Sequence, residues 1–393
     1  MSEIRTGLDR LVAEDFASLR GRRVGLVCHP ASVDSRLVHL TQRCRAAGVN
    51  VVRCFGPEHG IWADAQDMIA VDDTQREPVT GAIVRSLYGS TEESLAPRAV
   101  DLADVDVLVI DLQDIGSRYY TYIYTAALCV RAASRAGIEA WVLDRPNPLG
   151  GSAVEGGLTG EGYLSFVGLF PLPVRHGLTL GEVVDLIATR AGFQASLKVI
   201  ELEGWRRSQL FDETGLPWVQ PSPNMPTLDT ALVYPGMCLV EGTNLSEGRG
   251  ATRPFETVGA AFIEPFGLAD DLNRRGLPGI RFRPLFFRPT FHKFAGQTIG
   301  GLGLHVTDRR AFQPLRAGLH FLDAVRRQCG PALVWRTEVY EFVGDRLAID
   351  LLFGGPEARE TIDAGGDVDA LWHRWQAEAE AFEPYRRRFL RYA

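Results

Sequence analysis

A glutamate and a histidine stand side by side in the sequence Gly-Pro-Glu-His-Gly at residues 56–60. The apolar run at residues 50–55 predicts a strand, and Gly56 and Pro57 end it. Glu58 and His59 are therefore expected at the carboxyl end of a strand, where open parallel sheets bind ligands. Apolar surroundings disfavour the ionised form of a carboxyl group, which makes Glu58 a candidate general acid. The alternative is that Glu58 caps the following turn or pairs with an arginine.

His59 is a candidate to orient Glu58 or to bind a substrate hydroxyl group. A lone histidine is more often a structural hydrogen-bonding residue.

Three other predicted strands also end in polar clusters, which suggests a shared crevice. These strands lie at residues 23–28, 107–110 and 138–143. The clusters comprise His29, then Asp111, Asp114, Arg118, Tyr119 and Tyr122, and finally Asp144, Arg145 and Asn147. The carboxyl ends of parallel strands lie along one edge of a sheet, so the four clusters are expected to converge.

Two carboxylates and a sugar-binding surface would suit glycoside hydrolysis. Asp111 and Asp114 are candidates for the second carboxylate; alternatively, Asp111 caps a helix and Asp114 binds Arg118. Arg118, Tyr119 and Tyr122 offer a cation and aromatic faces for a sugar, although Tyr122 could equally pack within a helix. For Asp144 and Arg145, the alternative to a role in the site is that the two form a local ion pair with each other.

Two later loops have compositions that suit a site better than a core. Residues 221–226, Pro-Ser-Pro-Asn-Met-Pro, are stiff and present Asn224. Residues 241–250 interleave three glycines with polar side chains, among them Glu241, Asn244, Glu247 and Arg249. We expect both loops to line the crevice.

The alternation of strand and helix patterns predicts the fold class. Helices are expected at residues 36–47, 120–136 and 180–191, the last with Thr179 as its N-cap. The pattern predicts a Rossmann-like α/β domain, a mostly parallel sheet with helices on both faces, over residues 1–230. Residues 231–393 are mixed, with a strand expected at 303–307 and helices at 314–328 and 368–381. They predict a smaller α+β domain that completes the cleft.

Composition excludes several classes of function. The 393 residues carry a net charge of -7, which argues against nucleic acid as a partner. No signal peptide, membrane span or CxxC pair is evident, and the six cysteines are expected to be reduced thiols of a cytoplasmic protein. The sequence lacks a Walker A motif, a Gly-x-Gly-x-x-Gly after the first strand, a Gly-x-Ser-x-Gly and a His-Glu-x-x-His. No cofactor and no metal are therefore predicted.

Several motifs resemble those of the NamZ family of exo-acting β-N-acetylmuramidases. They are residues 56–60, 111–122, 143–148, 173–177, 221–227 and 241–250, and they span nearly the whole chain. The resemblance implies a Rossmann-like domain, a smaller C-terminal domain and an active site between them. It also implies release of N-acetylmuramic acid from the non-reducing end of cell-wall fragments, with Glu58 as the catalytic acid.

The resemblance also narrows the candidate residues. Those for catalysis are Glu58, His59, Asp114 and Glu241. Those for substrate binding are His29, Asp111, Arg118, Tyr119, Tyr122, Asp144, Arg145, Asn147, Arg175, His176, Asn224, Asn244, Glu247 and Arg249. Muramic acid carries a lactyl carboxylate, for which Arg118, Arg145, Arg175 and Arg249 are candidates. The loop at residues 61–68 departs from many relatives, so substrate choice is expected to differ there.

Several questions stay open at this point. The second catalytic group is Asp111, Asp114, Glu241 or Glu247, and the sequence does not choose between retention and inversion. The alternative functions are a metal-dependent hydrolase or deacetylase of amino sugars and a non-catalytic muropeptide-binding protein. The expected partner is a small muramic-acid saccharide, and a homodimer is left open.

Overall fold

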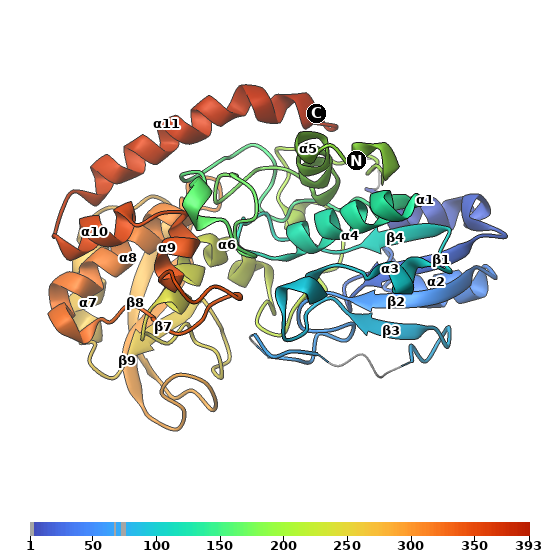
Figure 1. Cartoon of the computed structure of the whole chain (residues 1–393). Helices are drawn as coiled ribbons and strands as arrows, with labels where there is room; N and C mark the ends of the chain where they lie inside the picture. The colour runs from blue at the N-terminus through green and yellow to red at the C-terminus, as the bar shows by residue number, and fades with distance from the viewer. Residues whose placement is uncertain (1–3, 67, 72–75) are drawn as a thin grey trace.

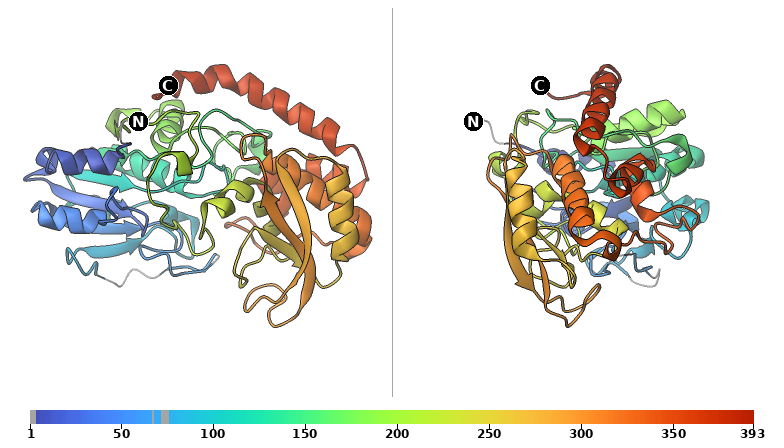
Figure 2. Two further views of the ribbon diagram at one scale, coloured as in Figure 1. Left: turned by 180° about the vertical axis from the view of Figure 1, so that it is seen from behind. Right: turned by 90° about the vertical axis from the view of Figure 1, so that its left-hand side faces the viewer.

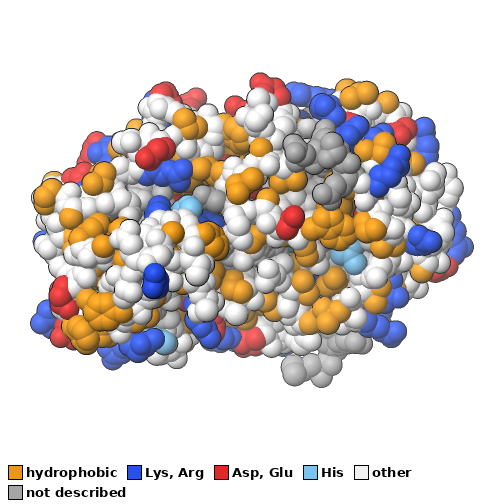
Figure 3. Space-filling model, turned by 90° about the horizontal axis from the view of Figure 1, so that it is seen from below, with side chains coloured by type: hydrophobic (Ala, Val, Ile, Leu, Met, Phe, Trp, Pro, Cys, Tyr) orange, Lys and Arg blue, Asp and Glu red, His pale blue; other side chains and the backbone are white. Residues whose placement is uncertain are grey.

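The computed structural model describes residues 4–66, 68–71 and 76–393. Two lobes lie side by side in Figure 1, and the last long helix, α11 (Val368–Arg386), arches from the second lobe back over the first. Figure 2 shows the same arch from behind, and Ile4, the first described residue, belongs to a small core against which Tyr392 of the C-terminal tail packs. On the underside in Figure 3, basic, acidic and hydrophobic side chains are interspersed.

The first lobe is built on a parallel sheet that has six strands within the described residues. They are β1 (Arg23–Cys28), β2 (Asn50–Gly56), β3 (Ile83–Ser86), β4 (Val107–Asp111), β5 (Glu139–Leu143) and β6 (Leu197–Ile200). Their order is β3-β2-β1-β4-β5-β6, and every neighbouring pair is parallel. The order reverses between β1 and β4, and open α/β sheets commonly bind ligands outside the carboxyl ends of the strands at such a reversal. The predicted Rossmann-like fold is confirmed.

Helices cover both faces of this sheet because the side chains of a strand alternate between its faces. Val24 and Leu26 of β1 belong to a core with Leu8 of α1 (Gly7–Ala13) and Leu40 of α2 (Leu40–Ala46). Val27 points the other way, into a core shared with α3 (Ala99–Leu102), α4 (Tyr122–Ala136) and α5 (Leu180–Ala191).

The second lobe combines helices with a small antiparallel sheet. Its sheet has the order β7-β9-β8, made by β7 (Thr257–Ala260), β9 (Ile299–Val306) and β8 (Ile280–Phe287). Its helices are α6 (Leu228–Met237), α7 (Pro265–Arg274), α8 (Pro314–Cys329), α9 (Ala348–Phe353), α10 (Glu357–Asp363) and α11. Helices α6 and α8 touch backbone to backbone, since a Cβ on Gly236 would lie 1.9 Å from the Pro314 carbonyl oxygen.

One hydrophobic core runs through both lobes. It includes Ile110 of β4 and Ile123 of α4 as well as Leu302 of β9 and Phe321 of α8. The C-terminal tail adds a further link, because the Arg207 N–H donates to the Ala393 carbonyl. The lobes therefore pack as one body, and the predicted division at residue 230 stays a prediction.

Most predicted elements are present, with local corrections. The strands predicted at residues 23–28, 50–55, 107–110 and 138–143 correspond to β1, β2, β4 and β5. Thr179 caps α5 as predicted, by accepting a hydrogen bond from the Glu182 N–H. Helix α2 begins at Leu40 rather than residue 36, because His39 caps it. The short edge strands β3 and β6 were not predicted. All six cysteines are free thiols, as expected.

Candidate active site between the two lobes

A small cavity of about 40 Å³ lies where the ends of β2 and α4 meet the second lobe. Its lining joins segments that are far apart in the sequence. The lining residues are Glu58, His59, Tyr119, Tyr120, Thr121, Tyr122, Val167, Ser222, Asn224, Met225, Tyr234, Glu241, Arg249, Phe255, Tyr340 and Glu341.

Glu58 lies in this cavity in the turn that follows β2. The turn is tight, because a Cβ on Gly56 would lie 2.5 Å from the Ile61 nitrogen. The Glu58 side chain is buried, and its Oε2 accepts a hydrogen bond of 2.6 Å from the Thr121 hydroxyl group. Its backbone carbonyl faces the Tyr122 hydroxyl at 3.3 Å. The N-terminus of α4 thus contacts both the side chain and the backbone of Glu58.

His59 is fixed beside Glu58 by an unusual backbone conformation. Its φ of 70° lies in the left-handed region, which non-glycine residues enter mainly where the surrounding structure enforces it. Its Nδ1 lies 3.0 Å from the Ala65 carbonyl oxygen, which can only accept, so Nδ1 carries a proton. Its Nε2 lies 4.0 Å from Glu58 Oε1. The geometry suits the predicted orienting role.

Glu241 provides a second buried carboxylate in the same lining. It belongs to a short 3-10 helix, Cys238–Gly242, that follows α6. Its Oε1 accepts from Arg249 at 2.6 Å, and its Oε2 accepts from the Tyr340 hydroxyl at 2.8 Å. Glu241 therefore faces a cation, whereas the hydrogen bond that holds Glu58 comes from a neutral hydroxyl. Such a difference in environment separates acid and base roles in paired carboxylates.

Glu247 supports this arrangement from outside the lining. Its side chain is fully buried and lies within 3.1 Å of nitrogen atoms of Arg249, His292 and Lys293. Burial opposes its ionisation, but the charges of Lys293, Arg249 and His292 outweigh burial and hold the pKa of Glu247 far below its usual range. Glu247 is an anion that fixes Arg249, and the structure does not place it among the residues that face the cavity.

Aromatic side chains form much of the remaining wall. Tyr119 donates to the Pro235 carbonyl and Tyr122 to the Pro221 carbonyl. Burial raises the pKa of both tyrosines, so both stay neutral donors. Asn224 donates to Gln66 at 2.8 Å. The structure thus brings the predicted residues Tyr119, Tyr122 and Asn224 to the site.

His29 lies behind the wall rather than in it. Its Nε2 accepts from the Gln113 N–H at 2.8 Å, and its Nδ1 therefore donates to the Pro221 carbonyl. Burial lowers the pKa of His29 to about 3, so its ring is neutral. The ring packs edge to face on Tyr122. His29 positions the 221–226 segment instead of touching the cavity.

Asp111 and Arg145 bind each other. Nε and Nη2 of Arg145 donate to the two Asp111 carboxylate oxygens at 2.6 and 2.8 Å, and both residues are buried. This pair replaces the helix cap suggested for Asp111 and the ion pair suggested between Asp144 and Arg145. Asp144 instead accepts from the Thr179 and Tyr392 hydroxyls and the Gly181 N–H, which fastens α5 and the C-terminal tail.

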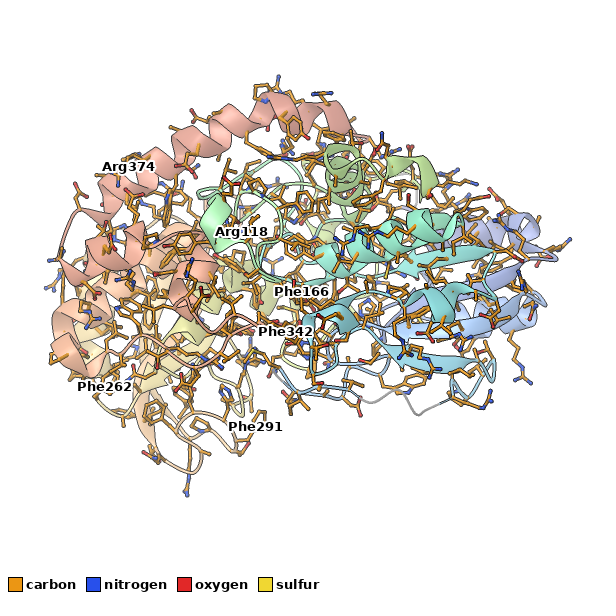
Figure 4. The ribbon with its side chains drawn as sticks, in the orientation of Figure 1. Arg118, Phe166, Phe262, Phe291, Phe342 and Arg374 are labelled. Atoms are coloured by element: carbon orange, nitrogen blue, oxygen red, sulfur yellow. The ribbon has the colours of Figure 1, made fainter. Side chains whose placement is uncertain are left out.

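Arg118 is also a structural residue. It is fully buried near the middle of the molecule in Figure 4 and donates to the carbonyls of Gly157, Leu172 and Leu352. The suggested pair with Asp114 is therefore wrong. Arg175 binds Glu155 and the Leu149 carbonyl. Neither arginine lines the cavity. Each one holds together backbone segments that are distant in the sequence.

The remaining candidates sit in turns outside the lining. Asp114 accepts from the Gly116 N–H, and its carboxylate lies 3.5 Å from His176 Nε2. Asn147 donates to the Leu178 carbonyl, and Asn244 donates to the Ala332 carbonyl. Their contacts hold loops in place. The structure does not bring these four residues together with Glu58.

Sequence reasoning missed part of the lining. Thr121 stands inside the motif at residues 111–122, next to residues that were singled out. Tyr340 and Glu341 lie in no motif, and only the packing of the second lobe brings them to Glu241 and Tyr88. Among the described residues, no group of three or more His, Cys, Asp and Glu side chains could hold a metal ion. No helix in the described part of the chain is long and apolar enough to cross a membrane.

Three buried glutamates, Glu58, Glu241 and Glu341, line a cavity between a Rossmann-like lobe and an α+β lobe, and paired carboxylates in such a cavity suit an α/β enzyme that cleaves glycosidic bonds. The chain belongs to the NamZ family. Residues 24–229 match the family model described as "Exo-beta-N-acetylmuramidase NamZ, N-terminal", and residues 232–392 match its C-terminal counterpart.

Individual relatives agree with this assignment. The "Peptidoglycan beta-N-acetylmuramidase NamZ" of Bacillus subtilis (strain 168) is 39% identical over 391 residues, which are 99% of this chain and 92% of that protein. A crystal structure of a DUF1343 family protein from Bacteroides fragilis NCTC 9343 is 31% identical with a TM-score of 0.88, over 100% of both chains. A second one from that organism is 25% identical with a TM-score of 0.77, over 100% of this chain and 99% of its own. The predicted family is confirmed.

Proposed function

We propose that this chain is an exo-acting glycoside hydrolase that releases N-acetylmuramic acid from the non-reducing end of peptidoglycan fragments, with Glu58 as the proton donor. The observation that carries the proposal is that Glu58 and Glu241 share one cavity in different electrostatic surroundings. Family membership supports the reaction and the substrate class. The small, buried cavity suits the end of a glycan rather than its middle.

Glu58 would protonate the leaving oxygen. Its Oε2 is held by Thr121, so the proton is assigned to Oε1, the oxygen nearest His59. The bond between the anomeric carbon and the glycosidic oxygen breaks, and the leaving sugar takes the proton. Water adds its oxygen to the anomeric carbon, and the overall reaction returns a proton from water to Glu58.

Glu241 is the second group that the geometry favours. The contact with Arg249 suits it as an anion that stabilises positive charge developing on the sugar ring, acting as base or nucleophile. Of the sequence candidates for this role, Asp111 is bound to Arg145, Asp114 lies in a turn, and Glu247 holds Arg249. Proton NMR of the first-formed anomer distinguishes the two mechanisms, because a β product indicates retention and an α product indicates inversion.

Arg249 is the candidate for the lactyl carboxylate. Among Arg118, Arg145, Arg175 and Arg249 it is the one that lines the cavity. Comparing hydrolysis of a chromogenic muramide with that of the matching glucosaminide tests this role. R249K should lower the preference for the muramide, because a lysine lacks the planar fork that binds carboxylates in two places.

The E58Q variant tests the proton donor. We expect kcat/KM on a chromogenic muramide to fall by about 10²-fold or more, because glutamine keeps the bond from Thr121 but has no proton to give. The matched control is E256Q, a buried glutamate outside the cavity that accepts from the Thr230 hydroxyl. It should keep its activity per folded molecule. Full activity of E58Q would refute the role of Glu58.

The same assay separates the alternative functions. Loss of activity with a chelator, restored by added metal, would favour a metal-dependent hydrolase. Binding of a muramic saccharide without any turnover would favour a non-catalytic binding protein. The homodimer and the cytoplasmic location stay predictions; light scattering and cell fractionation test them.

A further inference from the structure

A second, larger cavity adjoins the active site. This cavity, the distal groove, has a volume of about 420 Å³, roughly ten times that of the catalytic cavity. Glu341 lines both cavities, so the two cavities lie on opposite sides of one shared wall. On the catalytic side of the wall stand Val167 and Tyr340, and on the groove side stand their neighbours Phe166 and Phe342.

The wall is well packed around Tyr88. The Tyr88 ring contacts Phe166 at 6.1 Å and Phe342 at 5.6 Å between ring centroids, and its hydroxyl donates to Glu341 at 3.1 Å. Phe166 and Phe342 lie together where the lobes meet in Figure 4. The groove therefore adjoins the catalytic cavity across this wall, and its aromatic and aliphatic side chains, which lie beside charged ones, suit the apolar faces of sugar rings.

Two arginines of α4 line the same groove, together with Glu92 and Glu93. Arg131 and Arg135 line it and lie one turn apart on α4. Neither forms an ion pair with a described residue, whereas Arg98 at the rim is paired with Asp101. Like charges at this spacing destabilise a helix slightly. Burial lowers the pKa of Arg131, and the charge of Arg135 lowers it further. The charge of Glu92 acts in the opposite direction. A bound anion would relieve this repulsion.

The position of the arginines fits a longer glycan. Thr121, which binds Glu58, precedes α4, and Arg131 lies ten residues further along, about 15 Å at 1.5 Å per residue. A ligand that reaches both places needs more than one ring beyond the bond that is cleaved. In a glycan from which the stem peptides have been removed, every second sugar is a muramic residue with a free lactyl carboxylate, so an anion recurs along the leaving chain.

We propose that the distal groove is a subsite for the leaving glycan, in which Arg131 and Arg135 bind the lactyl carboxylate of the next muramic residue. The inference rests on the proposed function. The proposal predicts that this protein prefers fragments with two muramic residues to the disaccharide, which has one.

Hydrolysis of three substrates tests the proposal: a chromogenic muramide, the disaccharide of N-acetylmuramic acid and N-acetylglucosamine, and the tetrasaccharide that repeats this unit. Wild-type protein should cleave the tetrasaccharide with the highest kcat/KM. The double variant R131Q/R135Q should lose about tenfold on the tetrasaccharide, equivalent to 1.4 kcal/mol, through KM. Its rates on the two smaller substrates should not change. R131K should keep most of the preference because it keeps the charge.

The control variant is R190Q, an exposed arginine on α5 outside the groove, which should behave as wild type. Added salt should raise KM for the tetrasaccharide more than for the two smaller substrates, since it screens exposed charges more than buried ones. An unchanged tetrasaccharide rate in the double variant, or an equal loss on all three substrates, would overturn the subsite. A wild-type protein that releases muramic acid from none of the three substrates would instead overturn the proposed function and the subsite with it.

Discussion

The hydroxyl group of Thr121 donates a hydrogen bond of 2.6 Å to Oε2 of Glu58, across a separation of 63 residues in the sequence. The bond joins the start of α4 to the turn after β2. Helix α4 packs against the sheet in the core of the first lobe. The bond therefore links the orientation of the Glu58 carboxylate to that core. The nearby His59 Nε2 lies beside the other oxygen.

Removing this bond should lower catalysis without unfolding the protein. In T121V we expect kcat to fall by about tenfold with little change in KM, because a hydrogen bond to a charged group is worth about 1.5 kcal/mol or more. T121S, which keeps a hydroxyl group, should retain activity. An unchanged kcat in T121V, or an equal loss in T121S, would contradict the positioning role.

The buried anion Glu247 should make stability depend on pH. Its pKa is lowered in the folded protein from an ordinary value of 4.5, so it contributes stability above that pH and loses the contribution as pH falls. E247Q should cost about 3 kcal/mol or more at pH 7, because Arg249 and Lys293 lose their shared partner. Urea unfolding at several pH values should show the difference from wild type shrinking below pH 4.5. A constant difference would refute the argument.

The C-terminal tail should stabilise the first lobe most strongly at high pH. Burial raises the pKa of Asp144 from 3.8 to about 6, and the hydrogen bond from Tyr392 opposes burial. Because the raised pKa penalises the ionised form, stability is lost as pH rises through about 6, and the Tyr392 hydroxyl limits that loss. Y392F should therefore cost about 1–2 kcal/mol above pH 6 and less at pH 5.

Thermal unfolding of Y392F at pH 5 and pH 8 measures this difference. The matched control is Y385F, a change in α11 at a tyrosine outside this contact, whose effect on stability should not vary with pH. Equal losses at the two pH values in Y392F would show that Asp144 does not respond to the tail.

Arg118 should contribute to the free energy of unfolding and not to catalysis. Lysine cannot reach the three carbonyls that Arg118 binds, and each one left unpaired costs about 1–3 kcal/mol. R118K should lose several kcal/mol in urea unfolding and keep its kcat and KM per folded molecule. The exposed Arg374, labelled in Figure 4, is the control, because R374K changes a surface ion pair of little value. A raised KM in R118K would restore the substrate role.

The local sequence correctly predicted the strands beside the site and the turn that holds Glu58. Gly56 and Pro57 end β2 and leave Glu58 at a strand end, and this placement needs only the apolar run before them and the backbone limits of the two residues. The continuous apolar run of β4 likewise predicted a strand buried on both faces. The long family motifs identified the family, because their order along the chain does not depend on the fold.

Sequence reasoning was less successful for the polar clusters at the other strand ends. His29, Asp111 and Asp144 do lie at the ends of β1, β4 and β5, so the clusters were located correctly. Their side chains bind the 221–226 segment, Arg145 and the tail instead of facing the cavity. A buried polar group must find partners, and those partners come from distant segments that the local pattern does not reveal.

The sequence by itself determined the fold class, the family and the place of Glu58, since periodicity, turn residues and motif order are local properties. Only the tertiary structure decided which side chains share the cavity with Glu58. Arg249 and Tyr340 reach the site because the two lobes pack through one core, and Thr121 reaches it because α4 packs against the sheet of the first lobe. Contacts over such separations depend on how whole elements pack, and packing is decided by the complete chain.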